Sequence, residues 1–145
     1  MINELLLSRK GPNHKRALIL VALLVGIATN EVEAKKELPP PRPNAQELAL
    51  LPEACNARLN GSPEIRAAWE QRIGRDNFLH LHHYCFGLNY INRAKITFDK
   101  PLKRYFLQAA GNNFDYVLEH WPADSPLRPE AEAGKRQVEM LFRLL

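Results

Sequence analysis

The sequence lacks the motifs that identify several common kinds of chemical site. It contains no Cys-x-x-Cys-His motif for attaching haem and no glycine-rich loop for binding phosphate. No serine, histidine and aspartate form a recognisable nucleophile context, and the carboxylates are scattered over helix positions that we expect to be solvated. We therefore predict a protein that is not an enzyme and that has no resident cofactor.

Basic residues are not clustered along the chain. The 20 Lys and Arg residues exceed the 16 Asp and Glu residues, for a formal net charge of +4, and the two signs are interspersed. A nucleic-acid-binding protein usually carries its basic residues as a concentrated patch. The sequence therefore predicts no nucleic-acid partner.

The chain also lacks an apolar run long enough to cross a bilayer. Its apolar run at residues 17–28 would extend about 18 Å as a helix, whereas a hydrocarbon core is roughly 30 Å thick. Four basic residues precede this run, and small residues suited to cleavage follow it: Arg9, Lys10, Lys15 and Arg16 before, Val32 and Ala34 after. We interpret residues 1–34 as a signal peptide and predict export to the bacterial periplasm or beyond. Contact with the membrane would then be transient, and a retained N-terminal anchor is the alternative.

Only two cysteines are present, Cys55 and Cys85. In an exported protein, two cysteines favour one disulfide over two free buried thiols. The loop that this disulfide closes has about 30 residues, so the chain-entropy model gives a stabilisation of roughly 3–4 kcal/mol.

Residues 35–44, with the sequence KKELPPPRPN, are rich in proline and charge. Proline has no amide donor and fixes φ, so this segment is not expected to form a packed helix. We predict an extended linker here and a single domain over residues 45–145.

No segment of the chain alternates between apolar and polar residues as a half-buried strand does, and we predict an all-α domain. Helical spacing of apolar residues predicts helices over about 52–59, 62–73, 76–94, 99–121 and 129–145. Ser62, Asp76 and Asp99 are each placed to cap a helix N-terminus.

The segment from Phe78 to Ala94 is predicted to be the central helix. At 100° per residue, it has two adjoining faces that are apolar or semi-apolar, so we expect it to pack between two neighbours. One face carries Leu81, Tyr84, Cys85, Leu88 and Ile91, and the other carries His80, His83, Gly87, Tyr90 and Ala94. The third side carries the remaining residues, His82, Phe86, Asn89 and Arg93.

The helix pair over residues 78–122 resembles a degenerate tetratricopeptide repeat. Gly87 and Tyr90 have the spacing of that family, and so do residues of the second helix: Ala110, Phe114, Val117 and Pro122. His83 stands where Trp is usual, and the connection between the two helices is longer than in the standard repeat. The string His-His-Tyr-Cys-Phe-Gly-Leu at residues 82–88 is also similar to that of exported bacterial repeat proteins of unknown function.

This resemblance implies a peptide- or protein-binding groove lined by the first helix. By offset from Gly87, its residues would be Leu81, Tyr84, Leu88, Ile91 and Asn92. Because Cys85 lies on the same face, a bridge to Cys55 would lay the N-terminal helix across the groove. We therefore expect the groove to be filled, wholly or partly, by the chain's own N-terminal segment.

The histidines suggest an alternative function, binding of zinc or copper in the periplasm through the cluster His80–Cys85. His80 and His83 lie one helical turn apart and are able to share a metal ion, whereas His82 points elsewhere. The other interpretation is that His83 occupies a packing position of the repeat.

The last predicted helix is strongly apolar at its C-terminal end, with Val138, Met140, Leu141, Phe142, Leu144 and Leu145. It either packs back on the domain, pairs with another chain, or belongs to a longer array of repeats of which this chain is a part. The excess of apolar residues favours an interaction surface. The sequence as a whole thus predicts an exported interaction or scaffold module with a protein or peptide partner.

Overall fold

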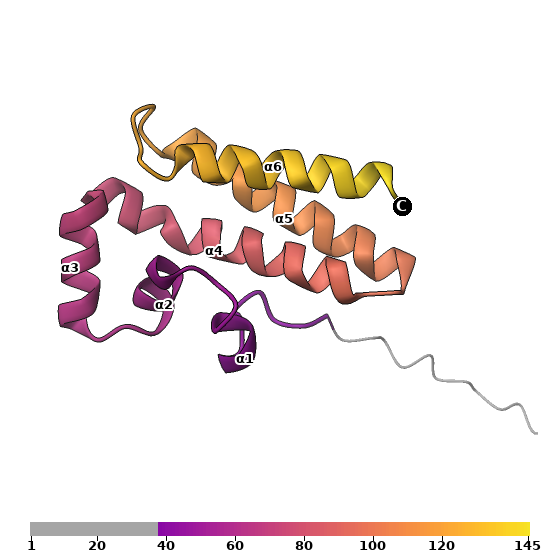
Figure 1. Cartoon of the computed structure of the whole chain (residues 1–145), viewed down its shortest axis with the longest axis horizontal. Coiled ribbons are helices and arrows are strands. Elements are labelled where there is room, and N and C mark those ends of the chain that lie inside the picture. Colours follow the sequence, from indigo (N-terminus) through magenta and orange to yellow (C-terminus); the bar gives the residue numbers. More distant parts are fainter. Residues whose placement is uncertain (1–37) are drawn as a thin grey trace, which may run out of the picture. The chain divides into compact units, whose positions relative to one another are not determined.

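The structure is a computed structural model that describes residues 38–145. The predicted signal peptide and the first part of the predicted linker lie outside these residues. The described part of the chain forms six helices and no strand, so the all-α prediction is confirmed (Figure 1). They are α1 (Ala45–Leu48), α2 (Glu53–Asn60), α3 (Pro63–Ile73), α4 (Arg75–Ile96), α5 (Lys100–His120) and α6 (Arg128–Arg143).

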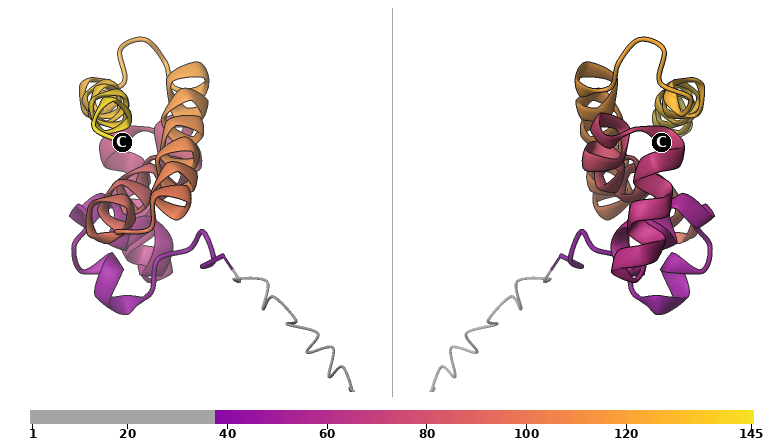
Figure 2. Two further views of the ribbon diagram at one scale, coloured as in Figure 1. Left: turned by 90° about the vertical axis from the view of Figure 1, so that its right-hand side faces the viewer. Right: turned by 90° about the vertical axis from the view of Figure 1, so that its left-hand side faces the viewer.

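Helix α4 is the centre of the domain. It contacts α2, α3, α5 and α6, and it shares its largest interface with α5. Figures 1 and 2 show α5 and α6 on one side of α4 and the short helices α1 and α2 on the other, while α3 stands steeply across the N-terminal end of α4. The prediction of a central helix between two neighbours is therefore confirmed.

Most helix ends follow from local sequence. The side chains of Ser62 and Asp99 accept hydrogen bonds from main-chain N–H groups in the first turns of α3 and α5, as predicted. The prediction that Asp76 caps α4 was wrong, because α4 already begins at Arg75. Gly74 both ends α3 and precedes α4, with a φ of 88° that a residue with a Cβ adopts only at a cost.

The ring of Phe114 on α5 occupies the centre of the helix packing. It is fully buried, and two glycines from neighbouring helices lie against it, Gly87 on α4 and Gly134 on α6. A Cβ added at either glycine would come within 3.0 Å of the ring. The glycines therefore allow α4, α5 and α6 to approach each other around one aromatic side chain.

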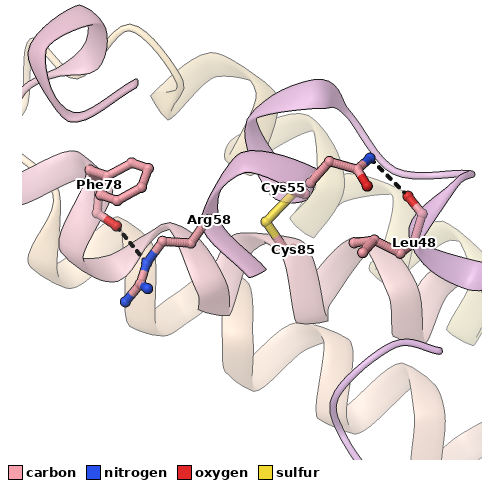
Figure 3. Close-up of a disulfide and its surroundings, with 6 residues drawn as sticks. Leu48, Cys55, Arg58, Phe78 and Cys85 are labelled. Carbon is pink, nitrogen blue, oxygen red and sulfur yellow. Dashed lines mark hydrogen bonds between the residues drawn. A yellow bond between two sulfur atoms is a disulfide. The ribbon is translucent and has the colours of Figure 1, made fainter. Parts of the chain in front are cut away.

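The disulfide between Cys55 and Cys85 is present, as predicted (Figure 3). Both cysteines are fully buried, and their Cα atoms are 5.5 Å apart. The bond attaches α2 to the middle of α4. One turn further along α2, the Arg58 Nε donates to the main-chain oxygen of Phe78 at 3.0 Å, so this helix is held to α4 at a second point.

The third side of α4 is not open to solvent along its whole length. Asn89 and Arg93, which belong to this side, are buried. The main chain at Pro40 and the side chain of Glu47 cover this part of the helix. Between residues 38 and 145, none of the helices combines the length and the apolar character that a membrane crossing requires.

Candidate binding surface

The five predicted groove residues do not form one surface. Leu81, Tyr84 and Ile91 are buried, and Leu88 and Asn92 are partly exposed. The Tyr84 ring lies against Phe114 and Trp121, with ring centroids 6.2 and 5.7 Å apart. Tyr84 thus faces α5 rather than the N-terminal segment, and burial, with Glu130 nearby, raises the pKa of its hydroxyl to about 12.

A hollow of about 380 Å³ lies beside the C-terminal half of α4, and Asn92 is the one predicted groove residue that lines it. It lies between that half of α4 and the segment around α1, and seven residues line it: Glu47, Leu50, Asn89, Asn92, Arg93, Lys95 and Ile96. Two of them are large apolar side chains that are mostly in water, Leu50 at 73% and Ile96 at 77% exposure. Phe98, two residues beyond Ile96, is fully exposed. This concentration of exposed apolar side chains around a hollow is the strongest candidate for a binding surface.

An ion pair forms the wall of the hollow. Arg93 donates two hydrogen bonds to the Glu47 carboxylate, from Nε at 2.7 Å and from Nη2 at 2.9 Å. The Arg93 Nη1 also donates to the main-chain oxygen of Pro40 at 2.7 Å. These hydrogen bonds, together with the charge of the guanidinium, hold the pKa of Glu47 below its usual value.

Asn89 lies in the same wall and is fully buried. It is near enough to Glu47 to contribute to the lowering of that pKa, but neither atom of its amide makes a hydrogen bond of standard geometry in the described part of the chain. An amide buried in this way loses its hydrogen bonds to water without replacing them. A ligand that entered the hollow deeply enough would find a donor and an acceptor there.

The end of the predicted linker contacts the domain. Besides the bond from Arg93 to Pro40, Arg42 donates to the main-chain oxygen of Leu59, and Pro43 is buried. Asn44 then starts α1 with a capping box, in which its side chain and that of Glu47 each accept from the other residue's main-chain N–H. Residues 40–44 therefore lie along the domain, next to the hollow.

The predicted metal ligands lie in a cluster of stacked rings on α4 and α5. The Tyr116 ring lies between His83 and His120, with ring centroids 3.8 and 3.9 Å away. His80 lies beside the same tyrosine, and its Nδ1 is 3.3 Å from the Tyr116 hydroxyl. The folding of α5 onto α4 also brings His120 to His80, with ring centroids 5.0 Å apart.

This cluster does not provide a set of metal ligands. Across residues 38–145 no three His, Cys, Asp or Glu side chains are grouped so that they could hold a metal ion, and Cys85 is committed to the disulfide. The Nδ1 of His83 is 2.9 Å from the side-chain oxygen of Asn113, which fits a packing role. Burial, together with other nearby cationic or histidine side chains, lowers the pKa of His80 and of His82.

The residues that carry the repeat resemblance mostly lie in the contact between α4 and α5. Gly87, Tyr90, Ala110 and Phe114 are buried, and the Tyr90 and Phe106 rings pack with centroids 6.0 Å apart. His83 is partly exposed, and Pro122 is exposed just after the end of α5.

The C-terminal helix α6 packs back on the domain. Ala131, Gly134 and Val138 are buried, and α6 contacts both α5 and α4. Its outer face still exposes Met140 and Leu144, which border a shallow hollow of about 410 Å³. Packing thus accounts for much of its apolar character, although these two side chains remain in water.

Sequence reasoning did not find Glu47, Leu50 or Ile96. The Asn-x-x-Glu spacing at Asn44 and Glu47 was a signal for a helix start, but it does not indicate that Glu47 meets Arg93.

Comparison of the chain with protein-family models, with curated proteins and with solved structures finds no match.

Proposed function

We propose that this chain is an exported, non-enzymatic interaction module that holds a segment of a partner protein in the hollow between α1 and α4. The observation that carries the proposal is the exposure of Leu50 and Ile96 at the edge of a hollow of about 380 Å³. Covering two such side chains would stabilise a complex by about 1.5–3 kcal/mol each.

The remaining lining residues suggest the chemistry of the partner. Asn92 and the buried Asn89 offer amide donors and acceptors that suit the main chain of a peptide, and Lys95 offers a positive charge at the rim. A peptide segment with one or two apolar side chains and an acidic residue matches these groups. We propose such a segment as the ligand.

The resemblance to tetratricopeptide repeats supports the same proposal. In that reading α4 and α5 are the two helices of one repeat, with Gly87, Ala110 and Phe114 in its packing positions. The chain's own α2, attached through the disulfide, covers part of α4, and the hollow lies beside the C-terminal half of the same helix. Export is supported by the predicted signal peptide and by the disulfide, which persists in oxidising compartments.

The proposal is tested by selecting peptides from a random phage-displayed library on the purified chain and measuring their affinity by calorimetry. Ile96→Asp and Leu50→Asp should each weaken the affinity for the selected peptides by at least about tenfold, because each removes an apolar contact that the complex would bury. Leu144→Asp is a matched control, since Leu144, just after α6, is 76% exposed and lines a different hollow.

Two results would contradict the proposal. One is the recovery of no peptide with saturable binding. The other is equal weakening by all three substitutions, because it would show that binding does not depend on the hollow. If only Leu144→Asp weakened peptide binding, the binding surface would lie at the end of α6 and not at this hollow.

A further inference from the structure

A second hollow, of about 190 Å³, lies between α2, α3 and the first turns of α4. Each of the three helices contributes one arginine to its lining: Arg58 from α2, Arg66 from α3 and Arg75 from α4. Phe78 and Leu79 form its apolar part, and Glu70 is the one carboxylate among its lining residues. Arginines from three separate helices meet here only because the chain folds.

Arg58 is held in a fixed position in this hollow. Its Nε and Nη2 donate to the main-chain oxygens of Phe78 and Leu79 at 3.0 and 3.3 Å, and its guanidinium lies over the Phe78 ring, 5.4 Å from the centroid. These contacts use only part of the donors of the guanidinium. Figure 3 shows this side chain extending from α2 to the main chain of Phe78, one helical turn along α2 from the disulfide that attaches α2 to α4.

The charges around the hollow do not balance. Glu70 faces three guanidinium groups, and its contact with Arg75, at 4.0 Å between Oε1 and Nε, is at the limit of an ion pair. Burial lowers the pKa of Arg58, and repulsion from the Arg66 guanidinium lowers it further, with a smaller opposing effect of Glu70. An anion between them would relieve this repulsion and accept the unused N–H groups.

We propose that this arginine hollow binds an oxyanion of the phosphate type. Arginine guanidinium groups match the oxygens of phosphate in pairs, and three of them surround the hollow from different directions. A volume of about 190 Å³ is below the roughly 300–1,000 Å³ of sites for drug-sized molecules, so a single phosphate group fits it better than a larger ligand. The group belongs either to a small free phosphate or to the headgroup of an anionic lipid.

The test uses the full-length chain and inorganic phosphate as the probe, with binding followed by nuclear magnetic resonance of the arginine Nε–H groups at low salt. Phosphate should shift the signals of Arg58, Arg66 and Arg75 in a saturable way. Arg66→Gln and Arg75→Gln should each weaken binding by about fivefold, a size typical of an exposed charge contact. Glu70→Gln should strengthen binding by a similar factor, because it removes the opposing charge.

Arg72→Gln is the matched control. Arg72 lies on α3 like Arg66, but its guanidinium stacks over the Trp69 ring and does not line the hollow. All of these substitutions except that of Glu70 are at exposed positions, so the variants are expected to fold. Equal weakening by Arg72→Gln and Arg66→Gln would show diffuse attraction to a basic surface and would overturn the proposal.

A second arm separates the two sources of the phosphate. The same variants are sedimented with vesicles of phosphatidylcholine alone and with vesicles that contain phosphatidylglycerol. If Arg66→Gln abolishes binding to the anionic vesicles and Arg72→Gln does not, the ligand of the hollow is a lipid headgroup. If the chain binds inorganic phosphate but not the vesicles, the ligand is a free phosphate. If neither inorganic phosphate nor the anionic vesicles bind, the proposed site is refuted. None of these outcomes tests the proposed peptide site beside Ile96, which is a separate hollow.

Discussion

Arg93 on α4 and Glu47 on α1 form a bidentate ion pair, although the two residues are 46 positions apart in the sequence. Their side chains are only 8% and 23% exposed. The pair fastens the N-terminal segment to the central helix, and it forms one wall of the hollow that we propose as the peptide site. Several properties of the protein should therefore depend on it.

Arg93→Ala should lower the free energy of unfolding by about 3 kcal/mol, because it leaves the Glu47 carboxylate, which is 23% exposed, without its guanidinium partner and removes the donor to the Pro40 carbonyl. Unfolding in urea measures this loss. Arg104→Ala, which removes an exposed arginine on α5, should change stability by no more than about 0.5 kcal/mol. A loss of similar size in both variants would mean that the ion pair does not hold the segment.

The contribution of Glu47 should depend on pH. Its pKa is lowered in the folded protein, mainly by the hydrogen bonds from Arg93, so the stabilisation is present above the usual value of 4.5 and is lost as the pH falls through the lowered value. The difference in unfolding free energy between the original chain and Glu47→Gln should thus be constant near neutral pH and shrink below pH 4.5. A difference that stays unchanged into strong acid would contradict the assignment.

Replacing both cysteines by alanine should destabilise the domain by about 3–4 kcal/mol, since the bond closes a loop of 30 residues in the unfolded chain. Urea unfolding of this variant and of the original chain under oxidising and reducing conditions measures the effect. Reduction should lower the stability of the original chain but leave the variant unchanged. Equal responses to reductant would show that the effect does not come from this bond.

Two glycine substitutions should have opposite effects. Gly134→Ala places a Cβ 2.5 Å from the buried Phe114 ring and should destabilise the protein by about 1–3 kcal/mol through overpacking. Gly111→Ala, on α5, meets Val138 at an ordinary contact distance of 3.7 Å and should stabilise the helix by about 0.5–1 kcal/mol. Thermal unfolding of the two variants measures the contrast, and a gain in stability for Gly134→Ala would refute the packing described around Phe114.

His80 and His82 should each titrate with a pKa below the usual value of histidine. Burial, followed by the nearby His120 and His83, lowers the pKa of His80, so His120→Gln should raise it toward 6.5. The imidazole proton signals in nuclear magnetic resonance follow this change directly. Because the unfolded chain takes up protons more readily at His80 and His82, acidification below pH 6.5 should also reduce stability. An unchanged titration of His80 in His120→Gln would contradict the proximity of the two rings.

Local sequence was sufficient to predict most helix ends and the disulfide. Ser62 and Asp99 act on amide groups within three residues of themselves, and so their role does not depend on the rest of the fold. Asp76 shows the limit of such reasoning, because α4 begins at Arg75 with Gly74, at a φ of 88°, in the cap position, two residues before Asp76. The pairing of the cysteines followed from their number rather than from any knowledge of the packing.

The binding surface was not predictable in the same way. Helical periodicity placed Asn89 and Arg93 on the third side of α4 and did not indicate that they are buried, since periodicity describes one helix and contains no information on what a distant segment covers. The resemblance to tetratricopeptide repeats placed Tyr84 in a groove by its offset from Gly87, whereas that ring lies against Phe114 on α5 and against Trp121 just after α5. The hollow beside Ile96 depends on where residues 40–50 lie against α4, which no local pattern specifies.

The sequence by itself determined the helical class, the central position of α4 and the disulfide, because these follow from residue spacing, capping and cysteine count. Only the tertiary structure decided which charges meet. It paired Arg93 with Glu47, brought His120 to His80, and gathered Arg58, Arg66 and Arg75 around one hollow. The physical reason is that interactions between distant side chains depend on separations of a few ångströms, and these are set by how whole helices pack rather than by neighbours in the chain.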